Sequence, residues 1–188
     1  MPQLKLAAFV PFMLLFAACA SVGPKPKPVA TITSYGRFAT QLEGSMPANI
    51  VSGDIDIVSS HRLVERTREI PCVLGERFGV LFDLENLPGE AQVYQLLVKW
   101  EHPLLKSPSG RSSSETTLTW PAYGALHRSR NVYLDWGLEE PFELVSGTYR
   151  ITVHLGAEKL LEHSFRVACE TVNQRKLSTG PRSVAGDA

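Results

Sequence analysis

The side chains of this sequence best suited to metal binding or general-base catalysis are five scattered histidines. They are His61, His102, His127, His154 and His163. No two have the i, i+2 or i, i+4 spacing that brings two imidazoles together on one strand or helix, so the pattern predicts no metal site and no cofactor. We expect His154 on the solvent face of a strand. His163 alternates in phase with apolar neighbours, so we expect it at the core edge, bonded to a backbone carbonyl.

The carboxylates and hydroxyls form no catalytic pattern either. Neighbouring strand residues point to opposite faces, so Glu101 and His102 do not converge as acid and base, and His102 before Pro103 indicates a strand end. Asp54 and Asp56 share one strand face, but Ca²⁺ needs about 6–8 oxygen ligands, so a solvent-exposed face is expected. Ser112 to Ser114 close a Ser/Gly loop that lacks the Gly-x-Ser-x-Gly elbow of hydrolases. The sequence predicts no catalytic residue and a protein that is not an enzyme.

The N-terminal residues resemble a bacterial lipoprotein signal. One basic residue precedes an apolar run, Leu6–Ala18, that is shorter than the ~20 residues of a membrane-spanning helix. The Phe16–Cys19 junction resembles a lipobox, so we expect removal of residues 1–18 and attachment of lipid, including palmitate, to Cys19. Residues 19–29 are rich in Pro and Lys and are expected to form a tether.

An ordinary signal peptidase site is the alternative, because Ala18-Cys19-Ala20 also fits the A-x-A pattern. Cleavage there would release a soluble periplasmic protein without Cys19. By resemblance to enterobacterial lipoproteins, in which Asp after the lipidated cysteine retains the protein in the inner membrane, Ala20 indicates the periplasmic side of the outer membrane.

The two remaining cysteines, Cys72 and Cys169, are expected to form a disulfide. An exported protein meets an oxidising compartment, and a leftover odd cysteine would need its own explanation. The bridge would close almost the whole domain, which is worth about 4–5 kcal/mol in the chain-entropy model. Two buried free thiols are the alternative.

The segments between these residues alternate apolar and polar side chains with a period of two. The clearest runs are 78–84, 94–100, 132–136 and 149–155, which place Phe82, Trp100 and Trp136 in the core and Arg77 on a solvent face. Turn sequences separate the runs. Further strands are expected over Ala30–Phe38, Val51–Val58, Arg62–Ile70, Glu115–Trp120 and Leu160–Ala168.

About eight or nine short antiparallel strands, each with one apolar face, predict an all-β fold. The expected architecture is a single Ig-like β-sandwich over residues 30–169, with a closed barrel as the alternative. Antibody-type spacing is absent, since Val167 rather than Tyr stands two residues before Cys169. Residues 170–188 contain few large apolar side chains and are expected to form a flexible tail.

The charge balance argues against nucleic-acid binding. The chain has 19 basic and 19 acidic residues, and the signal segment removes only Lys5, so the mature chain lacks the basic excess that a phosphate backbone requires. Arg62, Arg66 and Arg68 alternate with acidic residues. This pattern predicts an edge strand whose charges resist pairing with other chains; the alternative is a face that docks a partner.

A series of short motifs resembles an uncharacterised family of exported bacterial domains, domain of unknown function 3859. The resemblance spans about residues 31–168 and implies an Ig-like sandwich without an assigned reaction or ligand. The motifs are Ser34-Tyr-Gly36, Ile70-Pro71, Gly75-Glu-Arg-Phe-Gly79, His102-Pro103, Phe142-Glu-Leu-Val145, Gly147-Thr-Tyr149 and Ser164-Phe-Arg-Val167.

These features predict a non-catalytic outer-membrane lipoprotein whose periplasmic sandwich binds an envelope protein or glycan partner. A soluble periplasmic chaperone-like or ligand-binding domain is one alternative. A hydrolase acting on envelope material is another. A pocket of clustered polar side chains would favour the hydrolase, and a flat apolar patch would favour partner binding.

Overall fold

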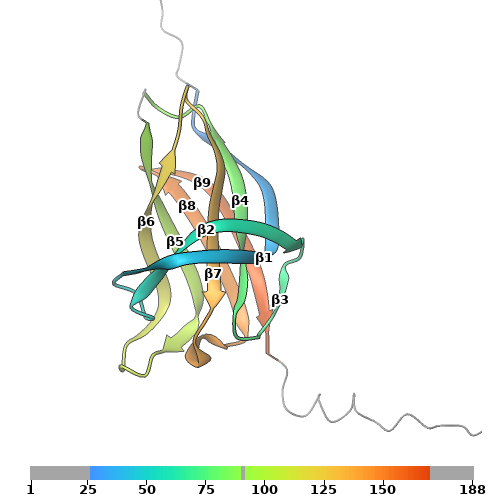
Figure 1. Cartoon of the computed structure of the whole chain (residues 1–188). Helices are drawn as coiled ribbons and strands as arrows, with labels where there is room; N and C mark the ends of the chain where they lie inside the picture. Colours follow the sequence, from blue (N-terminus) through green and yellow to red (C-terminus); the bar gives the residue numbers. More distant parts are fainter. Residues whose placement is uncertain (1–25, 90–91, 170–188) are drawn as a thin grey trace, which may run out of the picture.

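The computed structural model describes residues 26–89 and 92–169, which form two packed β-sheets (Figure 1). One sheet has four strands in the order β2-β1-β4-β7, and the other has five in the order β3-β9-β8-β5-β6. Across the described residues, no helix is long and apolar enough to cross a membrane. The elements are β1 (Val29–Pro47), β2 (Asp54–Glu65), β3 (Glu69–Pro71), β4 (Glu76–Glu85), β5 (Val93–Lys106), β6 (Ser112–Tyr123), β7 (Ser129–Leu138), the 3₁₀ turn η1 (Pro141–Glu143), β8 (Gly147–Leu155) and β9 (Glu158–Ala168).

The predicted all-β sandwich is confirmed, and its core follows the period of two. Alternate residues of β4, including Phe78 and Phe82, are completely buried between the sheets. Trp100 from β5 and Tyr149 from β8 pack edge-on against Phe78, with ring centroids 6.1 and 5.5 Å away. Trp136 from β7 packs against the same core, partly buried. The core positions predicted for Phe82 and Trp100 are therefore confirmed, and that of Trp136 is confirmed only in part.

Three details of the predicted strands are wrong. The separate strands expected over Val51–Val58 and Arg62–Ile70 are instead one continuous strand, β2, followed by the short β3. His102-Pro103 does not end its strand: β5 continues to Lys106, and its ladder to β6 is interrupted between Glu101 and Leu105. Such an irregularity accommodates a proline, which has no N–H for the ladder. The pairing of β3 with β9 is parallel.

The β1–β2 hairpin leaves the sheet halfway along its length. Residues 29–37 of β1 pair with β4, whereas residues beyond 37 pair only with β2, with several register shifts. We call residues 40–61 the arm; in Figure 1 it crosses in front of β7 and reaches toward β6. Gly36 permits this departure, because a Cβ there would lie 2.0 Å from the Glu65 carbonyl oxygen.

The disulfide between Cys72 and Cys169 is present in the structure, as the sequence predicts. It joins the residue after β3 to the residue after β9, and the Cys72 N–H donates to the Ala168 carbonyl at 3.1 Å. The bridge thus fastens the short parallel strand β3 to the edge of the five-stranded sheet.

Tyr149 makes hydrogen bonds that are typical of Ig-like domains and that the spacing of the cysteines does not predict. Its buried hydroxyl lies 3.3 Å from the Glu143 carbonyl and 3.4 Å from that of Val145. Burial raises the pKa of Tyr149 to about 12, so the hydroxyl stays a donor. A tyrosine that bonds a few residues upstream is the corner arrangement of Ig-like domains. Here it fixes η1 against the start of β8.

Candidate functional site

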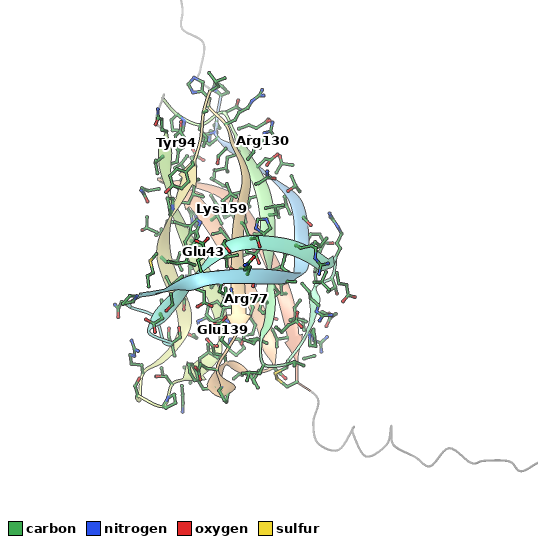
Figure 2. All side chains as sticks on the ribbon, viewed as in Figure 1. Glu43, Arg77, Tyr94, Arg130, Glu139 and Lys159 are labelled. Atoms are coloured by element: carbon green, nitrogen blue, oxygen red, sulfur yellow. A yellow bond between two sulfur atoms is a disulfide. The ribbon has the colours of Figure 1, made fainter. Side chains whose placement is uncertain are left out.

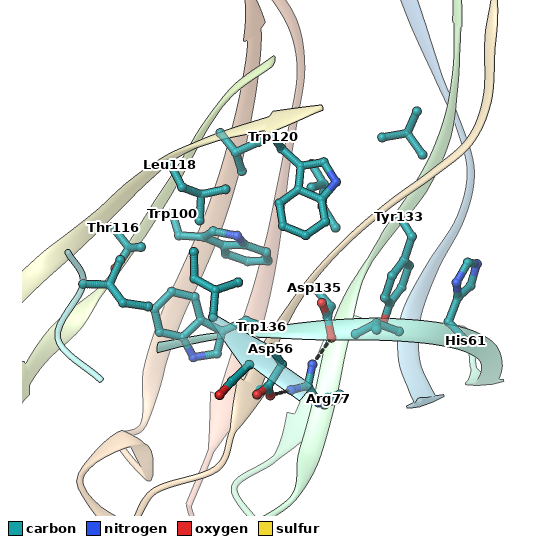
Figure 3. Close-up of a pocket in the computed structure, with 18 of the residues that line it drawn as sticks. Asp56, His61, Arg77, Trp100, Thr116, Leu118, Trp120, Tyr133, Asp135 and Trp136 are labelled. Atoms are coloured by element: carbon teal, nitrogen blue, oxygen red, sulfur yellow. Dashed lines mark hydrogen bonds and ion pairs between the residues drawn. The ribbon is translucent and has the colours of Figure 1, made fainter. Parts of the chain in front are cut away.

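A cleft of about 580 Å³ opens between the free edges of the two sheets, β6 and β7, under the arm (Figure 3). It reaches both faces of β7: Trp136 packs toward the core, while Tyr133 and Asp135 lie on the face beneath the arm. Small-ligand sites have volumes of about 300–1,000 Å³ and combine apolar walls with a few polar groups. The cleft has this size and composition, so it is the candidate functional site.

All three tryptophans of the chain line this cleft. Trp100 comes from β5, Trp120 from β6 and Trp136 from β7, and the alternation of each strand turns the indole inward. Trp100 is almost fully buried, with its ring centroid 5.7 Å from that of Trp136, whereas Trp120 and Trp136 keep exposed surface. The cleft therefore offers indole surface for stacking against a ligand.

Arg77 organises the polar end of the cleft. It comes from β4 and is only 7% exposed. Its Nη1 donates to Asp135 at 2.6 Å, and its Nη2 bonds both Asp56 on the arm and Glu139 after β7. Figure 2 shows Arg77 and Glu139 close to the arm. One guanidinium thus links the sheet, the arm and the β7–β8 connection, and three carboxylates surround one positive charge.

Burial and mutual repulsion perturb these carboxylates. Burial raises the pKa of Asp135, and burial together with a hydrogen bond to Asp56 raises the pKa of Glu139 to about 7. Burial opposes the charge of Arg77, but Asp135 and Glu139 outweigh that effect and raise the pKa of the guanidinium. Glu139 therefore takes up a proton as the pH falls through about 7. No three His, Cys, Asp or Glu side chains in residues 26–89 and 92–169 are placed to hold a metal ion.

Phe38 and His61 hold the base of the arm against Tyr133 of β7. His61 stacks on Tyr133 with ring centroids 4.1 Å apart and planes 5° apart, and Phe38 packs edge-on against both rings. Burial lowers the pKa of His61, which favours the neutral ring. His61 therefore acts here as a packing aromatic group.

His102 contacts the cleft residue Thr116 in an arrangement that resembles catalytic geometry. Its Nδ1 lies 2.8 Å from the Pro103 carbonyl and therefore donates; Nε2, at 3.3 Å, then accepts from the Thr116 hydroxyl. Burial lowers the pKa of His102, consistent with this neutral ring. An activated nucleophile has the same connectivity: an orienting group holds a base, and the base accepts a hydrogen bond from a hydroxyl. However, Thr116 is itself buried, and the contacts satisfy two polar groups of the core.

The other histidines are structural. His127 bonds the Leu87 carbonyl at 2.9 Å. His163 lies at the core edge as predicted, between Tyr35 and Phe165, but its Nε2 has no partner in the described part of the chain. The predicted bond from this ring to a backbone carbonyl is therefore not made by Nε2. His154 is half-buried with a buried Nδ1, so its predicted solvent position is wrong.

Two further predictions fail because the arm covers a face that alternation assigns to solvent. Asp54 is exposed as expected, but Asp56 points under the arm to Arg77. Arg77 itself is buried for the same reason. Separately, Ser112 to Ser114 are the first residues of β6 rather than the end of a loop, and Ser112 and Ser113 pair with β5.

The three arginines of the proposed partner face do not share one strand. Arg62 lies exposed on β2, the edge of the four-stranded sheet, as predicted. Arg66 and Arg68 follow β2, and their guanidinium carbons lie 5.3 and 5.5 Å from the Tyr35 ring centroid. A docking role for this face remains a prediction. Cys19, the expected lipidation site, lies outside the described residues.

The sequence does not single out Arg77, Asp135 and Glu139, because their spacing is that of ordinary solvent-facing strand residues. The sequence did contain one signal, because alternation turns all three tryptophans inward from three different strands. This pattern predicts that the three rings lie close together. It does not show that they border a cleft.

The fold and the tyrosine corner define an immunoglobulin-like β-sandwich. The family model for domain of unknown function DUF3859 matches residues 26–167, and the chain belongs to this family. The predicted resemblance is therefore confirmed for the domain.

One solved structure supports the fold. An immunoglobulin-like protein, PA1606, from Pseudomonas aeruginosa matches with a TM-score of 0.55 and 22% identity, over 78% of this chain and all of that one. The DNA-bound alkylpurine DNA glycosylase AlkC from Pseudomonas fluorescens matches with a TM-score of 0.34 and 17% identity, over 53% of this chain and 27% of that one. The second likeness is too weak to support an argument. No curated protein matches the sequence significantly.

Proposed function

We propose that this protein is a non-catalytic binding module, lipid-anchored at Cys19 on the periplasmic side of the outer membrane. The module binds an envelope protein or glycan partner through the cleft under the arm. The observation that carries the proposal is a cleft that gathers every tryptophan of the chain, while the charged groups at its polar end, Arg77 and its three carboxylate partners, are paired with one another.

The chemistry of the cleft suits recognition. Tryptophan is among the residues that contribute most to binding interfaces, especially in partly enclosed pockets. Indole faces also stack against the apolar faces of sugar rings, and carboxylate oxygens accept hydrogen bonds from hydroxyl groups. The carboxylates around Arg77 disfavour a phosphate-rich partner such as nucleic acid, because the local charge has the wrong sign.

Tryptophan fluorescence of the purified protein tests the site directly, since every tryptophan lines the cleft. Soluble peptidoglycan fragments serve as glycan probes, and a partner identified by crosslinking in intact cells serves as the protein probe. We expect a saturable emission change with one of them, and at least tenfold weaker binding for Trp120→Ala. Arg150→Ala, an exposed change on β8, is the matched control and should bind normally. Equal affinity of Trp120→Ala and wild type would place binding elsewhere.

A valine substitution separates binding from catalysis. Thr116→Val removes the hydroxyl that contacts His102 but keeps the shape of the side chain. Binding energy is spread over a surface, whereas catalysis collapses when its nucleophile is removed. We therefore expect Thr116→Val to complement a deletion strain fully, with normal abundance. Loss of complementation by this variant, with Trp120→Ala still active, would favour an enzyme.

The anchor has its own test. Radiolabelled palmitate should enter the wild-type protein and should not enter Cys19→Ser. Unlabelled wild type whose mature chain begins at Ser21 would show that ordinary signal peptidase cleaves the chain, and the protein would then be periplasmic without a lipid.

A further inference from the structure

One end of the sandwich carries four exposed large apolar side chains. The start of β1, the end of β4, the start of β5 and the β6–β7 and β8–β9 connections all lie at this end (Figure 1). We call it the apolar end. Its exposed apolar residues are Val29 (48% exposed), Val93 (41%), Tyr123 (72%) and Leu126 (91%).

Leu126 is held out by an unfavourable backbone. Ala125 and Arg128 exchange two hydrogen bonds of 2.8 and 3.0 Å, which leaves a two-residue hairpin loop. Both loop residues, Leu126 and His127, have positive φ values of 51° and 62°. Loops of this type favour Asn-Gly, because a left-handed conformation costs roughly 1–2 kcal/mol for most other residues.

His127 has a structural reason to stand in this loop, and Leu126 does not. The His127 ring bonds the Leu87 carbonyl, and the Leu87 N–H donates to the His127 carbonyl at 3.0 Å. Leu126 instead exposes almost its entire side chain. Backbone strain clusters at functional sites, and groups of exposed apolar side chains mark interaction surfaces.

We propose that the apolar end rests on the lipid bilayer, with Leu126 and Tyr123 entering its interfacial region. Leucine, tyrosine and a neighbouring arginine such as Arg128 are the side chains that interfacial contacts use. The inference rests on the proposed lipid at Cys19. That residue lies ten positions before Val29, so the chain between them spans at most about 35 Å. Because β1 begins at the apolar end, the tether joins the domain at the end that carries Leu126.

This contact would set the orientation of the domain. The η1 end would point away from the bilayer, and the cleft, which lies beside β7 under the arm, would open sideways into the periplasm. A flexible tether alone would leave the orientation undetermined.

A single introduced thiol tests the contact. Under the proposal Cys19 is acylated and Cys72 is bonded to Cys169, so Leu126→Cys provides the only free thiol of the lipidated protein. It is labelled with an environment-sensitive fluorophore, and the protein is anchored in phosphatidylethanolamine–phosphatidylglycerol vesicles. Ser109→Cys, in the exposed β5–β6 connection at the opposite end, is the matched control.

We expect a blue-shifted emission and several-fold stronger quenching by brominated acyl chains for the label at 126, and neither effect at 109. Equal, water-like emission from both sites in the anchored protein would overturn the proposal. Palmitate labelling reports separately on the anchor.

Should Cys19 prove unlipidated, flotation of the soluble protein with the same vesicles decides the question. Co-flotation of wild type with at least a threefold loss in Leu126→Ser would support the contact, and absence of flotation would overturn it. An unchanged unfolding midpoint of Leu126→Ser confirms that the fold is intact.

Discussion

Glu139→Gln should stabilise the protein at alkaline pH and remove part of its pH dependence. Glu139 shares the Nη2 of Arg77 with Asp56, and burial together with Asp56 raises its pKa to about 7 from an ordinary value of 4.5. A glutamine keeps the size of the side chain and can still accept a hydrogen bond from Arg77. It removes the charge that the folded state disfavours.

The sign follows from proton uptake. Between pH 4.5 and about 7 the folded protein keeps the proton that the unfolded chain has lost, so the free energy of unfolding falls as pH rises through this range. Each pKa unit corresponds to about 1.4 kcal/mol, which sets an upper limit of about 3 kcal/mol. The Glu139 side chain is 39% exposed, and solvent screens its interactions. We therefore expect a difference of about 1–2 kcal/mol.

Urea denaturation of wild type and variant at about pH 5 and about pH 8 measures this difference. The advantage of Glu139→Gln should be small at the lower pH and reach about 1–2 kcal/mol at the higher. Other carboxylates, such as Asp135, are present in both proteins, so their contributions largely cancel in the difference between variant and wild type. Glu43→Gln removes the same charge from an exposed position on β1. It is the control and should show no such pH dependence. Identical pH profiles for Glu139→Gln and wild type would refute the proposed charge crowding around Arg77.

Three further changes should alter stability by different mechanisms, each measurable by chemical denaturation. Phe82→Ala should destabilise by about 3–5 kcal/mol, because Phe82 is fully buried between the sheets; a loss below about 0.5 kcal/mol would contradict the assigned core. Replacing Cys72 and Cys169 together by serine should lose about 4–5 kcal/mol, since the bridge closes a separation of 97 residues, and reduction of wild type should reproduce the loss. Leu126→Asn should gain about 1 kcal/mol, because Asn tolerates a positive φ; a destabilised variant would show that Leu126 has a packing role.

The sandwich and its core could be predicted because both depend on local alternation. Phe78, Val80, Phe82 and Leu84 have the same phase, and each is fully buried. The disulfide was predictable by elimination, since an anchor at Cys19 leaves two cysteines. Both arguments need only the sequence separation and chemical type of the residues.

The cleft could not be predicted, because it depends on where one hairpin lies relative to another edge of the sheet. Alternation correctly assigns Arg77 and Asp135 to the outer face of the four-stranded sheet, but it cannot show that the arm covers that face. The same limitation explains why Asp56 was expected in solvent. Each residue obeys its local rule, and a long-range contact changes its environment.

Two glycines at one point of the sheet make this long-range contact possible. Gly36 of β1 and Gly79 of β4 are direct cross-strand partners. A Cβ on Gly79 would lie 2.1 Å from the Leu134 carbonyl oxygen and 2.7 Å from the Asp135 Cα, so only glycine lets β7 come this close. The approach places Asp135 within 2.6 Å of Arg77, while Gly36 lets the arm turn across the same strand. Glycine ordinarily weakens a strand interior. In this domain the two glycines are what allow a covered cleft to form beside β7.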